Sequence, residues 1–253
     1  MSGIKYTCMI CALLLWMWQN VSGTQTGSHN FVVHHSATVD GEAVQRIIDQ
    51  LESDYREFRH FFNLSISGRT NVYIHDDLLS LQSASLAHHF ETGTVYKNEI
   101  HLAPGQAVEK NIALSSLLTQ QAVRLVLYSR LINGCPRWLY EGAAAFFAGV
   151  HMLQSPPVYV PVVHPSDLNE LLLTPRTENE FNDTIYLTAL SLETIFKRYG
   201  EVHTITLFRL FNGEFDYEEA VPYALGVTVD EFERQWLIDL KEMLAAYRES
   251  HER

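Results

Sequence analysis

The segment from Val108 to Leu131 constrains the fold more than any other part of this 253-residue chain. Apolar residues recur on nearly every side of the helix that this segment predicts, so no broad polar face is left for solvent. Such a helix has to be surrounded by other elements, and a chain of this length with 47% hydrophobic residues can supply them. We therefore expect a sizeable domain built around a central buried helix.

A second helix follows the first almost directly. Asn133 and Gly134 end the buried helix, Pro136 suits the first turn of a new one, and Trp138–Phe147 supplies large apolar residues and alanines. The two helices are therefore expected to pack against each other.

Strand and helix patterns alternate before the buried helix, and only helix patterns follow it. The predicted strands are 31–36, 71–75, 92–96 and 99–102, and the early helices are 40–62 and 77–89. The late helices are 166–173, 185–199, 202–212, 217–225 and 228–247, the last opened by a Thr228/Glu231 capping box. This order predicts an α+β fold: a lobe with a small mixed sheet over residues 24–150 and a helical lobe over 151–253.

Residues 1–23 have the features of a secretory signal peptide. Lys5 gives the charged start, Tyr6–Trp18 the apolar run, and Val21–Gly23 the small-residue exit. A membrane anchor is the alternative, but the apolar run is shorter than the ~20 residues that a spanning helix needs. We expect a mature chain that begins near residue 24, contains no membrane span, and is secreted or periplasmic.

The charge balance limits the partners. The formal net charge is −12, and removal of Lys5 with the signal makes the mature chain more negative. Nucleic acids and anionic membrane surfaces attract basic proteins, so neither is an expected partner.

The order of the elements, and above all Pro136–Gly142, resembles the peptidase MA-like family of thermolysin-like (gluzincin) zinc metallopeptidase domains. In that family the buried helix carries His-Glu-x-x-His, and the next helix carries Pro-x-Trp-Leu-x-Glu-Gly, whose glutamate is the third zinc ligand. The resemblance extends to Tyr199, Gly200 and Trp236, and it implies a thermolysin-like N-terminal lobe with a substrate cleft. It also places His101 and Trp138 beside that cleft.

The zinc-binding motif of the family is degenerate in this chain. Alignment of the helices puts Gln120 at the first histidine, Gln121 at the catalytic glutamate and Arg124 at the second histidine, while Glu141 keeps the third-ligand position. An amide is a weak zinc ligand that cannot act as a base, and arginine is a permanent cation, so we expect no zinc. We predict instead that Arg124 and Glu141 form a buried ion pair.

The same residues also have interpretations that give them no role in a site. Glu141 on spacing alone resembles an exposed helical acid, and Gln120 and Gln121 are compatible with either solvent or a polar cleft. None of the twelve histidines stands four residues from a second ligand in a convincing helical context, which argues against a relocated metal site. Cys135 has no sequence context for activation, and no Gly-x-Ser-x-Gly elbow is present.

These observations predict an exported pseudopeptidase: a metallopeptidase-like domain without catalysis that binds a peptide or protein in the ancestral cleft. One alternative is an active hydrolase with a relocated or atypical site. Another is a structural subunit of an exported assembly.

Overall fold

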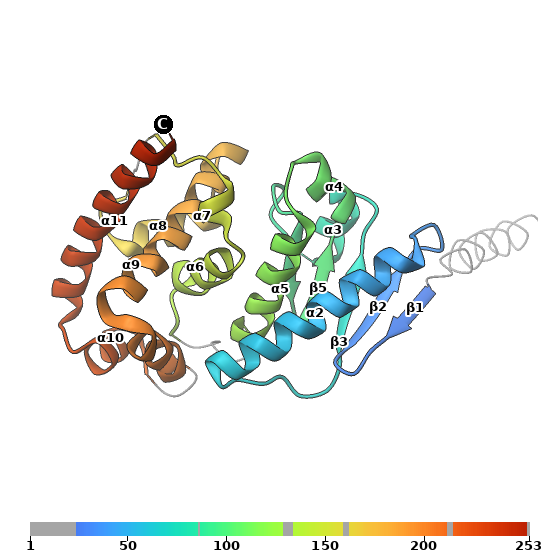
Figure 1. Ribbon diagram of the computed structural model, residues 1–253, viewed down its shortest axis with the longest axis horizontal. Helices are drawn as coiled ribbons and strands as arrows, with labels where there is room; N and C mark the ends of the chain where they lie inside the picture. Colours follow the sequence, from blue (N-terminus) through green and yellow to red (C-terminus); the bar gives the residue numbers. More distant parts are fainter. Residues whose placement is uncertain (1–23, 86, 129–133, 159–161, 212–214, 252–253) are drawn as a thin grey trace, which may run out of the picture.

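The computed structural model describes residues 24–85, 87–128, 134–158, 162–211 and 215–251. A five-stranded mixed sheet with the order β1-β2-β3-β5-β4 lies in one half of the molecule together with helices α2 to α5, and the other half is helical (Figure 1). β2, β3 and β5 run parallel, whereas β1 and β4 pair antiparallel at the two edges. The strands are β1 Thr24–Gly27, β2 Phe31–His35, β3 Thr70–Ile74, β4 Gly93–Tyr96 and β5 Glu99–Leu102.

The predicted class is confirmed at this level: a small mixed sheet is followed by a helical C-terminal part. The predicted signal peptide lies outside the described residues. The helices are α2 Gly41–Phe62, α3 Leu78–Ser85, α4 Pro104–Glu109, α5 Leu114–Tyr128, α6 Arg137–Phe147, α7 Val150–Leu153, α8 Pro165–Leu173, α9 Glu178–Phe211, α10 Tyr217–Leu225 and α11 Val229–His251.

Helix α2 illustrates how local signals set an element. Asp40 caps its start by accepting a hydrogen bond from the N–H of Glu42, and Asn63 ends it in the left-handed conformation with φ 53°. Its apolar residues fall on one side, which packs against the sheet and α5 (Figure 1). The predicted helix over 40–62 is therefore confirmed almost to the residue.

The buried helix begins later than the sequence predicts. Instead of one helix from Val108 to Leu131, the chain forms α4, turns at Asn111 with φ 56°, and begins α5 at Leu114. A left-handed residue cannot continue an α-helix, and asparagine tolerates that conformation better than most residues. From Leu117 onward α5 is buried on nearly all sides, as predicted, with Arg124 and Gln121 inside its buried stretch.

Helix α9 contains the break predicted between residues 199 and 202. Gly200 has φ 81° and ψ 168°, so two helical segments meet at a kink there. One of the two bonds of the predicted Thr228/Glu231 capping box is present, because the hydroxyl of Thr228 accepts the N–H of Glu231 at 3.2 Å where α11 begins.

Helix α6 lies between α5 and α9 and contacts both, so it joins the two halves of the molecule (Figure 1). At Gly142 the approach to α9 is so close that a Cβ atom would lie 2.5 Å from the carbonyl oxygen of Thr188. The buried apolar residues form a continuous core on both sides of α6. The position of α6 therefore requires glycine at residue 142, because any side chain there would meet the backbone of α9.

Edge strand β1 was not predicted, because Thr24–Gly27 lacks the alternation of apolar residues that indicates a strand. It is held by its ladder with β2 instead. In the ranges between residues 24 and 251 that the structure describes, no helix has the length and apolarity needed to cross a membrane.

Candidate functional site

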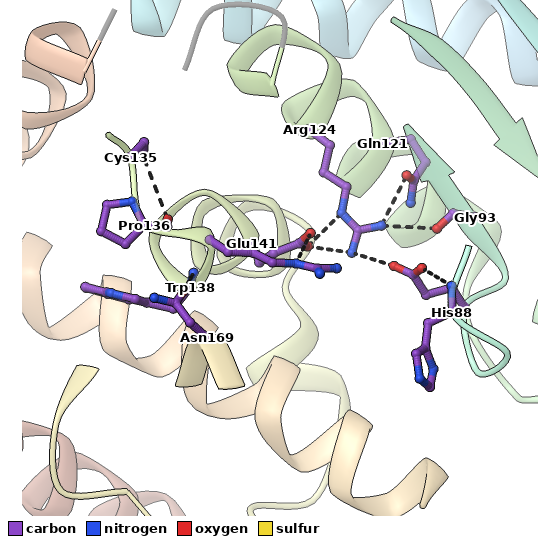
Figure 2. Close-up of polar contacts among 11 residues, drawn as sticks. His88, Gly93, Gln121, Arg124, Cys135, Pro136, Trp138, Glu141 and Asn169 are labelled. Carbon is purple, nitrogen blue, oxygen red and sulfur yellow. Dashed lines mark hydrogen bonds and ion pairs between the residues drawn. The ribbon is translucent and has the colours of Figure 1, made fainter. Parts of the chain in front are cut away.

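Helices α5 and α6 bring together the two partners of a buried ion pair. The side chains of Arg124 and Glu141 are each 6% exposed. Nε of Arg124 donates to Oε2 of Glu141 at 2.8 Å, and Nη2 lies 2.6 Å from the same oxygen. Figure 2 shows the two side chains pointing toward each other from the two helices. The Arg124–Glu141 ion pair predicted from the sequence is confirmed.

Three further acceptors surround the guanidinium of Arg124. Nη2 lies 3.6 Å from Oε1 of the buried Glu91, and Nη1 donates to the carbonyl of Gly93 at 3.1 Å and to Oε1 of Gln121 at 3.3 Å (Figure 2). Glu91 is itself held by the backbone N–H of His88 at 2.8 Å. Arg124 thus connects α5, α6 and the edge strand β4.

Two buried carboxylates share this one fixed cation. Burial by itself would lower the pKa of Arg124, but the charges of Glu141 and Glu91 outweigh it and raise that pKa, so the guanidinium stays charged. Burial raises the pKa of Glu91; Arg124 opposes this rise and Glu141 adds to it. The shorter contact belongs to Glu141, which makes Glu91 the more weakly held carboxylate.

The residues at the family's zinc positions do not fit a zinc ion. Gln121 is fully buried and already bonded to Arg124, Gln120 lines a cavity as a neutral amide, and the guanidinium of Arg124 lies against Glu141. A cation in the place of a ligand repels a metal ion. Among the residues that the structure describes, no three His, Cys, Asp or Glu side chains converge to hold a metal.

Two small cavities lie on either side of the Arg124–Glu91 contact, which is their common wall. Each has a volume of about 270 Å³, close to the lower end of the roughly 300–1,000 Å³ of typical ligand pockets, which suits one side chain of a larger ligand. The arginine pocket is lined by Ser85, His88, Glu91, Thr94, Val95, Tyr96, Arg124, Tyr128, Arg137, Tyr140, Glu141, Leu172 and Leu173. The second pocket has a mixed apolar and polar lining: Phe90, Glu91, Thr92, Gly93, Lys110, Asn111, Ile112, Ala113, Ser116, Leu117, Gln120, Arg124, Val150, Leu153, Gln154, Phe181, Asn182 and Ile185.

Strand β4 is the open edge of the sheet beside both pockets. Lys97 and Asn98 have positive φ values of 50° and 62° and form a two-residue turn, so Tyr96 and Glu99 are its closing hydrogen-bonded pair. Hydrogen-bonded and non-hydrogen-bonded pairs alternate along an antiparallel ladder. The backbone N–H and C=O of Val95 therefore point away from β5, toward the open edge.

The same alternation turns the backbone groups of Gly93 outward. The carbonyl of Gly93 is bonded by Arg124, whereas Val95 lines the arginine pocket. Arg124 thus satisfies the outward carbonyl of Gly93. Val95 is then the residue of β4 whose outward backbone groups can pair with another extended chain.

His101 and Trp138 do not line either pocket. The ring of His101 stacks on Tyr73 and His75, with its Nδ1 3.0 Å from Nε2 of His75, on the face of the sheet away from α5. Burial in this position lowers the pKa of His101 to about 4. Trp138 is 1% exposed and packs against Trp236. The structure therefore places both residues in the packing around the site rather than in it.

Cys135 has the properties of an inert thiol. Burial raises its pKa well above the usual value, and its Sγ lies 3.7 Å from the carbonyl oxygen of Pro136. These surroundings disfavour the thiolate that nucleophilic catalysis requires.

Sequence reasoning did not find Glu91 and Arg137. Glu91 belongs to an irregular segment, where no spacing rule relates it to a residue of α5. Arg137 did carry a signal, because it stands four residues before Glu141 on a predicted helix. The chain matches no protein-family model and no curated protein, so the functional argument depends on these residues and their geometry.

Proposed function

We propose that this protein is an exported pseudopeptidase that binds an extended segment of a peptide or protein along strand β4. The observation that carries the proposal is the guanidinium of Arg124, which pairs with Glu141 at 2.6 Å where the family resemblance expects a zinc ion. The fixed charge of the Arg124 guanidinium takes the place of the charge of the metal, and the cleft around Arg124 serves binding.

Catalysis of peptide hydrolysis by the family's route needs a metal-bound water and a general base. Gln121 stands at the position of the base, and its neutral amide accepts no proton at working pH. The buried carboxylates of Glu141 and Glu91 are the remaining acids near Arg124, and both are engaged by it. This set of groups supports binding better than hydrolysis.

An extended peptide matches the shape and chemistry of the site. The outward backbone groups of Val95 offer the hydrogen bonds by which an added strand pairs with a sheet edge, and the two pockets beside β4 are each large enough for one side chain. Export rests on the charged start and apolar run of residues 1–23.

The Val95→Pro variant tests this mode of binding. Proline removes the outward N–H of Val95 without taking a donor from the ladder with β5. Edge strands tolerate proline at such a position, where the N–H faces away from the sheet. We expect dodecapeptides selected from a random phage-displayed library on the unaltered protein to lose most of their affinity for Val95→Pro. Val95→Thr, which keeps the N–H, is the matched control and should retain binding.

Equal melting temperatures of the two variants would show that the loss is local. If no peptide is enriched, or if the selected peptides bind Val95→Pro as tightly as the unaltered protein, strand addition at β4 is wrong. Recovery of the protein only in a stable complex with another chain, without peptide affinity, would favour the structural-subunit alternative instead.

A further inference from the structure

The arginine pocket contains a cation with no hydrogen-bond partner among the described residues. Nε of Arg137 is buried and unbonded, and its closest carboxylate oxygen, Oε1 of Glu141, is 3.9 Å away, which is too far for a hydrogen bond. Glu141 is already committed to Arg124 through its other oxygen. The side chain of Arg137 remains 30% exposed and faces the cavity that it lines.

The position of Arg137 is unfavourable for stability alone. It is the first residue of α6, where the helix dipole disfavours a positive charge, and the first turn of that helix has no acidic residue. A second unpaired polar atom, the buried Nδ1 of His88, lines the same pocket. The guanidinium of Arg137 can donate to a ligand that enters the pocket, and Nδ1 of His88 can donate or accept according to its tautomer.

The charges around the pocket indicate which ligand fits. Arg124 and Arg137 are matched in number by Glu91 and Glu141, and Nε of Arg137 has no hydrogen bond, so a dianion such as phosphate would meet two carboxylates and have the guanidinium of Arg137 as its main donor. A single carboxylate matches the planar fork of one arginine, which binds it through two parallel hydrogen bonds. Tyr96, which lines the same pocket as Arg137, adds apolar surface for the stem of such a side chain.

We propose that the arginine pocket binds one carboxylate of the peptide that lies along β4, with Arg137 as the residue that selects it. This inference rests on the proposed function and names the class of ligand that the site prefers.

The spacing of the two pockets sets the spacing of the peptide residues. The arginine pocket lies beside Val95 and the second pocket beside Gly93, two residues apart on the same strand. Side chains two residues apart on an added strand share one face. In the preferred peptide, one residue therefore separates the acidic residue from the residue whose side chain enters the second pocket, in an order set by the direction in which the peptide runs.

The test is selection from the same random dodecapeptide library on the unaltered protein, on Arg137→Gln and on Arg46→Gln, a control at an exposed position of α2. We expect Asp or Glu to be enriched on the unaltered protein and on Arg46→Gln, but not on Arg137→Gln. Synthetic peptides that carry Glu or Gln at the enriched position should differ roughly 10- to 100-fold in Kd on the unaltered protein. On Arg137→Gln the two peptides should bind equally.

The outcomes separate the two proposals. Enriched peptides without an acidic residue, or an equal loss for the Glu and Gln peptides in Arg137→Gln, would overturn the carboxylate inference while strand addition at β4 stands. The absence of any enriched peptide would overturn both. Peptides whose affinity disappears when their C-terminus is amidated would assign the carboxylate to the chain end, whereas unchanged affinity would assign it to a side chain.

Discussion

The Arg124→Ala variant is expected to melt roughly 6–20 °C below the unaltered protein. Removing the guanidinium leaves Glu141 and Glu91 buried without a cation, and breaking a buried ion pair from one side costs about 3–5 kcal/mol of unfolding free energy. In a domain of this size each kcal/mol corresponds to about 2–4 °C. Thermal and urea unfolding followed by circular dichroism measure the effect.

Arg46→Ala is the matched control for charge removal. Arg46 also pairs with a glutamate, Glu42, at 3.8 Å, but both side chains are largely exposed, so its loss should cost no more than about 1 kcal/mol. A double-mutant cycle with Glu141→Ala should reveal strong coupling to Arg124. Equal small losses in Arg124→Ala and Arg46→Ala would contradict a buried pair.

The pH dependence of the Arg124→Ala deficit has a definite sign. Burial raises the pKa of Glu91 in the folded state and the charge of Arg124 opposes that rise, so removal of Arg124 leaves the folded-state pKa of Glu91 higher still. Groups with a raised folded pKa give stability that is present at low pH and lost as the pH rises. The difference in unfolding free energy from the unaltered protein should therefore shrink as the pH falls from 8 toward 5.

The Gly142→Ala variant should lose about 1–3 kcal/mol, although alanine is the better helix former. An added Cβ would stand 2.5 Å from the backbone oxygen of Thr188, and backbone cannot rotate away as a flexible side chain can. α6 has to move away from α9, and with it Arg137 and Glu141. We therefore expect weaker peptide binding together with the lower unfolding free energy.

Gly105→Ala is the matched control on another helix. Gly105 lies in α4 with no atom within 4 Å of the position of its Cβ, so alanine there should be neutral or stabilising by up to about 1 kcal/mol. If Gly142→Ala is as stable as Gly105→Ala, the close contact between α6 and α9 is wrong.

The features that were predicted correctly have local causes. Helix α2 and the break at Gly200 follow from apolar spacing and a backbone conformation that glycine adopts readily. The Arg124–Glu141 pair was predictable because the family resemblance puts the two residues on facing helices, where a buried arginine and a buried carboxylate satisfy each other.

The features that were missed depend on tertiary contacts. Glu91 reaches Arg124 only because the irregular chain before β4 folds over α5, and no residue spacing reports that path. β1 exists because β2 offers it a ladder, and the break at Asn111 overrides an apolar pattern that continues through it. His101 was assigned to the cleft from its strand, but alternation along β5 turns its ring to the other face.

The central claim is that the fixed charge of Arg124 stands where the family resemblance expects zinc. The most direct test is the zinc content of the purified mature protein by elemental mass spectrometry, with its melting temperature recorded with added zinc and with a chelator. The account predicts no stoichiometric zinc and a melting temperature that neither addition changes. About one zinc ion per chain, with a fall in melting temperature when a chelator removes it, would contradict the account.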